Sequence, residues 1–302
     1  MQVSTSQFFR SQSEQLSNLQ NETGALQKKI ATGRAIEVAS EDPISFSDIG
    51  RMRGQIANIE QYKRNIMRAT EKLVMEDNVL TQTITTVIRI HELAIFASNG
   101  TVNQNDRKSM AKEVSLLQDM LVDLANTPDA TGSSLFGGFV SKNKVFTADV
   151  NGNIVYEGDD SDIFSSIGDG IKININSTGT DTFMRVSTKR APTGESLFKI
   201  VKDTLDALNN GEPPLATGDG LKDAISHFTQ SQTITGTKLS RLSAQEGSLD
   251  AFQLSARSIL SGIEDTNIEA VVTKLKQKLL SLEASQASFV KITEQSLFNY
   301  LR

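Results

Sequence analysis

Apolar residues near the start of the chain recur at alternating spacings of three and four positions. They are Leu16, Leu19, Leu26 and Ile30, with Thr23 in the gap. This period places the side chains along one stripe of an α-helix and is typical of a coiled-coil seam. Gly33 then offers a C-terminal stop, and Asp42 followed by Pro43 offers an N-cap and a first helical position. A second helix is therefore expected to begin there.

The same spacing of apolar residues continues after Pro43 and predicts one helix from about 43 to 98. At about 1.5 Å per residue, such a helix is near 80 Å long. The stretch "SNGTVNQND" interrupts it. A third helix is expected from about 105, with Val114, Leu117, Leu121 and Leu124 on one face, ending before "NTPDATG".

Between about residues 132 and 190 the pattern changes to short alternating runs rich in β-branched residues, such as "KVFTADVNGNIVYEGDD" and "GIKININSTGTDTFMRVS". Alternation with a period of two is typical of strands, and the Asn-Gly and Gly-Thr pairs between the runs favour tight turns. The sequence therefore predicts a small β-rich insertion. The helical period returns from about 194 to 209 and again from about 219 to 264.

The closing helix is predicted to begin at Thr266, because Glu269 follows three residues later and completes a capping box. Its own 3-4 seam consists of Ile268, Val272, Leu275, Leu279, Leu282, Gln286, Phe289, Thr293, Ser296 and Tyr300. The large apolar residues Leu297, Phe298 and Leu301 extend to the end of the sequence, with no Gly or Pro to stop the helix. The two coiled-coil seams thus lie at opposite ends of the chain.

These elements predict a mainly α protein, an elongated multi-helix bundle with terminal coiled-coil helices and a small inserted β-rich domain. Chain termini commonly lie close together, so the first and last helices are expected to pair. We expect three parts. The terminal coiled-coil domain comprises 1–42 and 266–302, the helical bundle domain comprises 43–132 and 192–265, and the β-rich outer domain comprises 133–191.

Composition narrows the possible functions. The net charge of −5, with Lys and Arg scattered among 36 acidic residues, disfavours binding to nucleic acid. The chain has no cysteine, which excludes disulfides and thiolate metal sites. Its first residues lack a basic region followed by an apolar one, and no stretch approaches 18 apolar residues. We therefore expect neither a cleaved signal nor membrane insertion.

No catalytic, cofactor-binding or metal-binding constellation is predicted. His91 and Glu92 begin a zinc-protease pattern, but Ile95 stands where the second His is needed. Asp149, Asn151 and Asn153 have the spacing of a calcium loop, but the sixth position, which must be Gly, is Ile154. An Asn-Gly hairpin explains the same residues. "LFGGF" lacks the spacing and the Lys of a phosphate-binding loop, and Gly137-Gly138 is interpreted as the entry into the β-rich insertion.

The amphipathic ends remain as candidate functional surfaces. One interpretation is a coiled coil within a monomer, and the other is self-assembly through residues that neighbouring copies cover. On the second interpretation the predicted assembly or chaperone interface consists of Leu16, Leu19, Leu26, Ile30, Leu275, Leu279, Leu282, Phe289, Leu297, Phe298, Tyr300 and Leu301.

Several stretches of the sequence resemble the flagellin superfamily. "VSTSQFFRSQSEQLSNLQNETGALQKKI" and "ELAIFASNGTVNQNDRKSMAKEVSLLQDMLVDLANT" are similar to the first helices of that superfamily, and "LFGG" follows as it does in relatives. Asp42-Pro43 stands where flagellins usually read Asp-Asp-Ala-Ala-Gly, and the ending "ITEQSLFNYLR" resembles Leu-Phe-Asp-Tyr-Leu instead of the Leu-Leu of flagellin. Within the superfamily the sequence therefore favours the branch that joins hook to filament.

The resemblance implies a structural, non-enzymatic subunit of the bacterial flagellum, located outside the cell. It implies export through the flagellum's own type III secretion apparatus without a cleaved signal. The implied partners are the first hook-filament junction protein, flagellin, further copies of the chain, and an export chaperone at the C-terminal helix; no cofactor is implied. Two alternatives stay open, a flagellin of the filament and a cytoplasmic coiled-coil adaptor.

Overall fold

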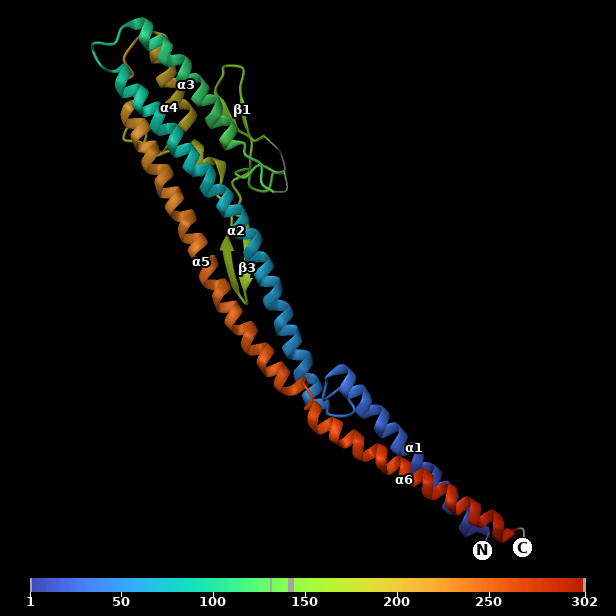
Figure 1. Ribbon diagram of the computed structural model, residues 1–302. Coiled ribbons are helices and arrows are strands. Elements are labelled where there is room, and N and C mark those ends of the chain that lie inside the picture. The colour runs from blue at the N-terminus through green and yellow to red at the C-terminus, as the bar shows by residue number, and fades with distance from the viewer. Residues whose placement is uncertain (1, 131, 141–143, 301–302) are drawn as a thin grey trace. The chain divides into compact units, whose positions relative to one another are not determined.

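The computed structural model describes residues 2–130, 132–140 and 144–300, with side chains described between residues 7 and 293 of those ranges. The chain divides into two compact units, one of residues 1–58 with 251–302 and one of residues 59–250. Figure 1 labels the elements. The α-helices are α1 (Gln2–Thr32), α2 (Pro43–Ala97), α3 (Gln104–Ala125), α4 (Leu197–Asn209), α5 (Gly218–Glu264) and α6 (Ile268–Tyr300).

Local residues set the end of α1 and the start of α2. Gly33 adopts φ +70° and donates its amide to Lys29 O at 2.9 Å, which is the left-handed stop that glycine accommodates. Asp42 Oδ1 accepts from the amides of Ile44 and Ser45, both at 3.1 Å. The Ser45 hydroxyl, followed by these amides, lowers the pKa of Asp42. The predicted stop and the predicted cap are both confirmed.

The predicted start of the closing helix, at Thr266, is wrong. The helix begins at Ile268, and Asn267 Oδ1 caps it by accepting from the Ala270 amide at 3.0 Å. Thr266 instead donates its amide to Gly33 O at 2.8 Å, so it does not form the capping box with Glu269. Tertiary pairing with the Gly33 segment therefore places the cap one residue later.

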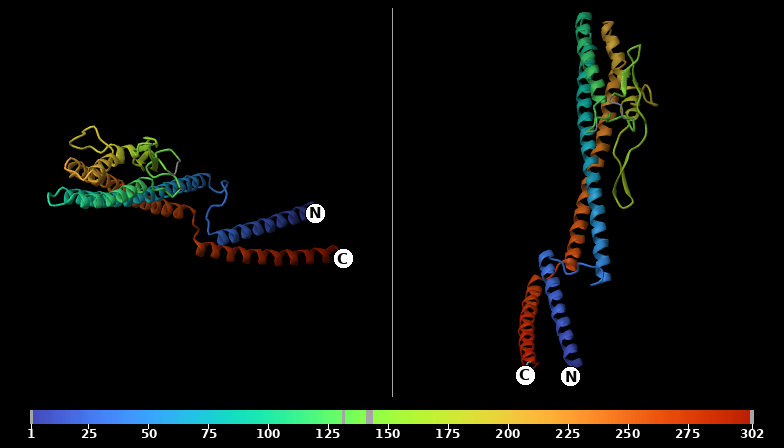
Figure 2. Two further views of the ribbon diagram at one scale, coloured as in Figure 1. Left: turned by 90° about the horizontal axis from the view of Figure 1, so that it is seen from above. Right: turned by 90° about the vertical axis from the view of Figure 1, so that its right-hand side faces the viewer.

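The core of the 59–250 unit lies where α3 and α4 pack against α2 and α5. Figure 1 and the right-hand view of Figure 2 show α2 and α5 side by side in this unit. Fully buried side chains from all four helices meet there, including Leu80, Val87 and Ile90 of α2, Val114 and Leu121 of α3, Phe198 and Val201 of α4, and Leu221 and Phe228 of α5. Their apolar burial is the main favourable term for this part of the fold.

The insertion forms two separate antiparallel hairpins. Strands β1 (Phe146–Ala148) and β2 (Ile154–Tyr156) pair with Phe146 opposite Tyr156. The predicted Asn151-Gly152 turn joins them, with Gly152 at φ +72°. Strands β3 (Phe164–Gly168) and β4 (Ile171–Asn174) form the second hairpin, which carries a bulge between Ser166 and Gly168.

The "LFGG" stretch anchors the insertion to the helical core. Leu135 and Phe136 are fully buried, and the Phe136 ring meets Phe183 edge-on at 5.1 Å between centroids. Phe183 belongs to a π-helical turn, η1 (Thr180–Met184). Gly138 has φ +65°, and a Cβ there would lie 2.3 Å from Asp159 O, so only glycine fits. The interpretation of Gly137-Gly138 as the entry into the insertion is confirmed.

The β3-β4 hairpin packs on the helices of its unit. Its buried Ile167 and Ile173 join a second apolar cluster with Ile66 and Leu73 of α2 and Leu242 of α5. Asn65 Nδ2 of α2 donates to Ser166 O at 2.8 Å, and Gln245 Nε2 of α5 donates to Ile167 O at 3.3 Å. The hairpin therefore shares a core with the helices.

The prediction of a mainly α chain with a small β-rich insertion is confirmed, since the described strands amount to two short hairpins among long helices. The division into three domains stays a prediction. Within the 59–250 unit, strands and helices contribute to the same apolar clusters.

Candidate assembly interface

Helices α1 and α6 pack against each other as an antiparallel pair (Figures 1 and 2). The Phe9 and Phe289 rings meet edge-on with centroids 5.8 Å apart, and Lys278 Nζ lies 2.6 Å from Glu22 Oε2. An antiparallel bridge links Arg34 with Asp265. Along α1, rising residue numbers meet falling residue numbers on the partner helix of the pair. The N-terminal end of α1 therefore lies beside the C-terminal end of α6. The predicted pairing of the first and last helices is confirmed.

The predicted seam residues line this helix pair. Half-buried seam positions are Leu16, Leu19, Leu26 and Ile30 on α1 and Leu275, Leu282 and Phe289 on α6. Leu279 is more open, with 37% of its surface exposed. Thr23 is buried, and its hydroxyl donates within its own helix, to Leu19 O at 2.9 Å or Gln20 O at 2.8 Å. The side chains of the predicted residues Leu297, Phe298, Tyr300 and Leu301 lie outside the described part.

A two-helix contact covers only one side of each helix, and α6 keeps apolar residues on its uncovered side. Leu280 and Val290, each one position after a seam residue, are 69% and 52% exposed. We call these two residues the outer flank of α6. Burying a large aliphatic side chain contributes roughly 1.5 to 3 kcal/mol. The outer flank can therefore add appreciable stability to a contact with another helix.

A charged node closes the helix pair at the end away from the chain termini. The backbone of the 33–35 segment pairs with residues 264–266, through Ala35 N to Glu264 O at 2.7 Å and Thr266 N to Gly33 O at 2.8 Å. The largely buried Glu264 carboxylate receives Arg34 Nε at 2.6 Å and Arg53 from α2 at 2.5 Å. The node therefore joins the end of α5 to both the 33–42 linker and α2.

The 33–42 linker is held by a second set of charges. Lys29 Nζ donates to Ala35 O at 2.7 Å and lies 3.1 Å from Glu41 Oε1, while Lys28 pairs with Glu37. The hydrogen bond from Lys28 lowers the pKa of Glu37, and the hydrogen bond from the Glu37 amide lowers that of Glu41. Both glutamates contribute stability above their unfolded pKa values that is lost as the pH falls through the lowered ones.

The N-terminal part of the chain matches a known protein family. Residues 3–141, which include α1, α2 and α3, match the bacterial flagellin N-terminal helical region. The resemblance to the flagellin superfamily expected from the sequence is confirmed.

Two curated relatives align beyond the flagellin-type N-terminal region. Flagellar hook-associated protein 3 of Salmonella typhimurium is 26% identical over 100% of both chains. Flagellin of Bacillus subtilis is 24% identical over 93% of both chains. The crystal structure of flagellar hook associated protein-3 from Legionella pneumophila, at 19% identity, covers 71% of this chain and 98% of its own with a TM-score of 0.64. That likeness supports the fold.

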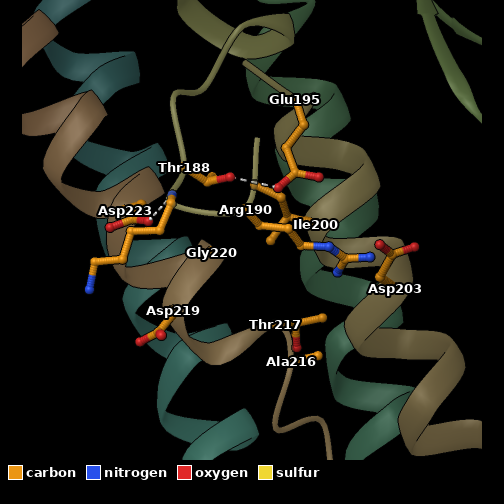
Figure 3. Close-up of a pocket in the computed structure, with 11 residues that line it drawn as sticks. Thr188, Arg190, Glu195, Ile200, Asp203, Ala216, Thr217, Asp219, Gly220 and Asp223 are labelled. Atoms are coloured by element: carbon orange, nitrogen blue, oxygen red, sulfur yellow. Dashed lines mark hydrogen bonds between the residues drawn. The ribbon is translucent and has the colours of Figure 1, made fainter. Parts of the chain in front are cut away.

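A small cavity outside the helix pair does not have the character of a ligand site. Figure 3 shows it between the 188–190 loop, α4 and the start of α5. The Thr188 hydroxyl donates to Glu195 Oε1 at 2.9 Å, and the Lys189 amide donates to Asp223 Oδ2 at 3.0 Å, so two of its carboxylates are engaged within the wall. Its volume of about 120 Å³ is well below the several hundred Å³ of typical small-molecule pockets.

Among the described residues, no three His, Cys, Asp or Glu side chains converge as a metal site. Within the same residues, no helix combines the length and hydropathy needed to cross a bilayer.

Sequence reasoning missed part of the interface. Phe9, which meets Phe289, continues the α1 seam toward the N-terminus, because positions 16, 12 and 9 are separated by four and three residues. The 3-4 spacing could therefore have predicted Phe9 as a seam residue. Glu264 and Arg53 are 211 positions apart, and no local pattern connects them. Only the fold brings that ion pair together.

Proposed function

We propose that this chain is a structural subunit of the bacterial flagellum at the junction between hook and filament, assembled through α1 and α6. The similarity over the full length to flagellar hook-associated protein 3 of Salmonella typhimurium supports the flagellar junction role. The antiparallel α1-α6 pair, whose seam is half-buried and whose outer flank is exposed, is the observation that carries the assembly mechanism.

The distribution of charge supports assembly through the terminal unit. Residues 1–58 and 251–302 carry 12 Lys or Arg and 11 Asp or Glu, whereas residues 59–250 carry 19 and 25. Their net charges are thus +1 and −6. Packing copies of a unit together costs electrostatic energy when each copy carries the same large charge. The nearly neutral terminal unit avoids that cost.

The partners follow from this role as proposals. In the junction, the neighbours of the chain are the first hook-filament junction protein, flagellin and further copies of itself. Before assembly, the apolar C-terminal helix is held by an export chaperone, and the chain leaves the cell through the flagellar type III apparatus without a cleaved signal. A ring or helical lattice needs different surfaces on the two sides of each subunit, which two unlike helices can supply.

A flagellin of the filament is the second candidate. The 24% identity to Bacillus subtilis flagellin over 93% of both chains favours it. The two candidates differ in what the purified protein does alone. A filament subunit polymerises into long filaments after seeding, whereas a junction subunit stops at a short assembly. Electron microscopy of the purified chain separates these outcomes.

The function is tested in cells that lack this chain. We expect hooks without filaments and flagellin released into the medium, and restoration of filaments by the full-length chain. A version truncated before residue 266 should stay soluble and fail to restore filaments, because it lacks α6. The variant Lys276→Ala, exposed on α6, is a matched control that should restore them. Filaments of normal length without the chain, or with the truncated chain, would disprove the proposal.

A further inference from the structure

The sequence contains three identical Asn-Gly dipeptides, Asn99-Gly100, Asn151-Gly152 and Asn210-Gly211, and all three asparagines are exposed. Asn followed by Gly is the pairing most prone to spontaneous deamidation, because no side chain shields the glycine amide nitrogen that attacks the asparagine. From the sequence alone, the three positions are equally susceptible.

Two of the three glycine amides are engaged in turns. Gly152 N donates to Asp149 O at 3.0 Å, and Gly211 N donates to Leu208 O at 3.0 Å. Each glycine is therefore the fourth residue of its turn, the position whose amide closes the hydrogen bond. An amide held by a carbonyl must give up that bond before its nitrogen can turn toward the preceding side chain.

The dipeptide at Asn99 sits in a different register of its turn. Val102 N donates to Asn99 O at 3.1 Å, so Asn99 is the first residue and Gly100 the second. Among the described residues, the Gly100 amide has no hydrogen-bond acceptor. Arg107 fixes the asparagine carbonyl further, with its guanidinium donating to Asn99 O at 3.3 Å and to Ala97 O at 2.9 Å. The backbone is held while the nucleophilic nitrogen is free.

We propose that Asn99 is the modification site at which the folded chain deamidates. The Gly100 nitrogen loses its proton and bonds to the Asn99 side-chain carbonyl carbon, and the side-chain nitrogen leaves as ammonia. Water then opens the resulting succinimide. Cleavage at the side-chain carbonyl gives aspartate, and cleavage at the main-chain carbonyl gives isoaspartate. One water is consumed and one ammonia released, with no redox change.

The product alters the loop between α2 and α3 in two ways. Both forms add a carboxylate at residue 99, whose main-chain carbonyl accepts from Arg107. The same guanidinium donates to Gly211 O at 3.2 Å and so links this loop to the end of α4. Isoaspartate in addition lengthens the main chain by one carbon, which displaces the Asn99 carbonyl from Val102 and Arg107. Deamidation therefore changes the connection of two loops at this end of the helices.

The test compares the three sites within one chain. The full-length protein is incubated at mildly alkaline pH, folded or in urea, and conversion at each asparagine is followed by peptide mass spectrometry. A hydrogen bond of net worth about 0.5 to 1.5 kcal/mol predicts roughly two- to tenfold slower conversion at Asn151 and Asn210 than at Asn99 in the folded chain. In urea the three rates should converge, because the turns are lost.

The variant Gly100→Ala supplies the matched control. A Cβ there meets no atom within 4 Å and the backbone is not left-handed, so the variant should fold, whereas Gly152 and Gly211 have φ +72° and +76°. The added methyl group should slow conversion at Asn99 alone. Equal rates at the three sites in the folded chain, or an Asn99 rate unchanged by Gly100→Ala, would overturn the proposal.

Discussion

Tyr156 illustrates how single residues secure the insertion. A Cβ at Gly158 or at Gly179 would come within 2.3 Å of the Tyr156 ring, so both glycines leave the space that the ring fills. The hydroxyl lies 2.8 Å from Phe136 O and 3.0 Å from Asp159 O, positions at which it donates a hydrogen bond. One aromatic side chain thus ties the β1-β2 hairpin to the segment that enters it.

Tyr156 gives a pH dependence with a defined sign. Burial, together with the charges of Asp160 and Asp159, raises its pKa from 10.0 to about 12. The folded state then binds the phenolic proton more tightly, so this contribution is full below pH 10 and is lost as the pH rises toward 12. The free energy of unfolding should fall more steeply over that range in the wild type than in Tyr156→Phe. Identical slopes in urea denaturation would contradict this assignment.

At the scale of elements, the start of α6 depends on Asn267. Replacing Asn267 by Ala leaves the Ala270 amide without its cap and should lower the free energy of unfolding by about 1 kcal/mol. Thr266→Ala is the control, because the structure assigns the cap to its neighbour, and it should cost less. Urea denaturation of both variants measures these losses. A larger loss of unfolding free energy for Thr266→Ala would instead support the capping box predicted from the sequence.

The node at Glu264 should matter more than an exposed ion pair. Glu264→Gln removes the charge that Arg34 and Arg53 share, and charge-assisted hydrogen bonds contribute about 1.5 to 3 kcal/mol each when well formed. Because both arginines are about half exposed, we expect the lower end of that range. Asp48→Asn, which breaks the exposed pair with Arg51, should cost under about 0.5 kcal/mol. Thermal unfolding of the two variants should rank them in that order.

Elements differ in how far the sequence predicts them. The bounds predicted for α2, α4 and α5, the starts predicted for α3 and α6, and the end predicted for α1 lie within a few residues of the observed ones, because caps, glycine stops and the 3-4 period act locally. No start was predicted for α1. The hairpins were predicted as strands from alternation and Asn-Gly turns. Their packing was not, because Ile167 and Ile173 reach cores formed by residues far away in the sequence.

At the scale of the whole molecule, assembly and monomer stability can be separated by two substitutions on α6. Leu280→Ala removes an exposed outer-flank side chain and should leave the melting temperature unchanged while lowering incorporation into flagella. Phe289→Ala removes the ring that meets Phe9 and should lower both. Circular dichroism and immunodetection of the chain in purified flagella measure the two effects. An equal loss of stability for Leu280→Ala would place that side chain in a contact within the monomer.

The sequence by itself determined which segments are helices, where Gly33 and Asp42-Pro43 end and begin them, and which stripes of α1 and α6 are apolar. These properties depend on neighbours within a few residues along the chain. The tertiary structure decided that the two stripes cover each other and that Glu264 forms ion pairs with both Arg34 and Arg53. It also decided that one of the three identical Asn-Gly pairs keeps a glycine amide without a hydrogen-bond acceptor among the described residues. Such features depend on atoms that are distant in sequence, and no local pattern encodes their position.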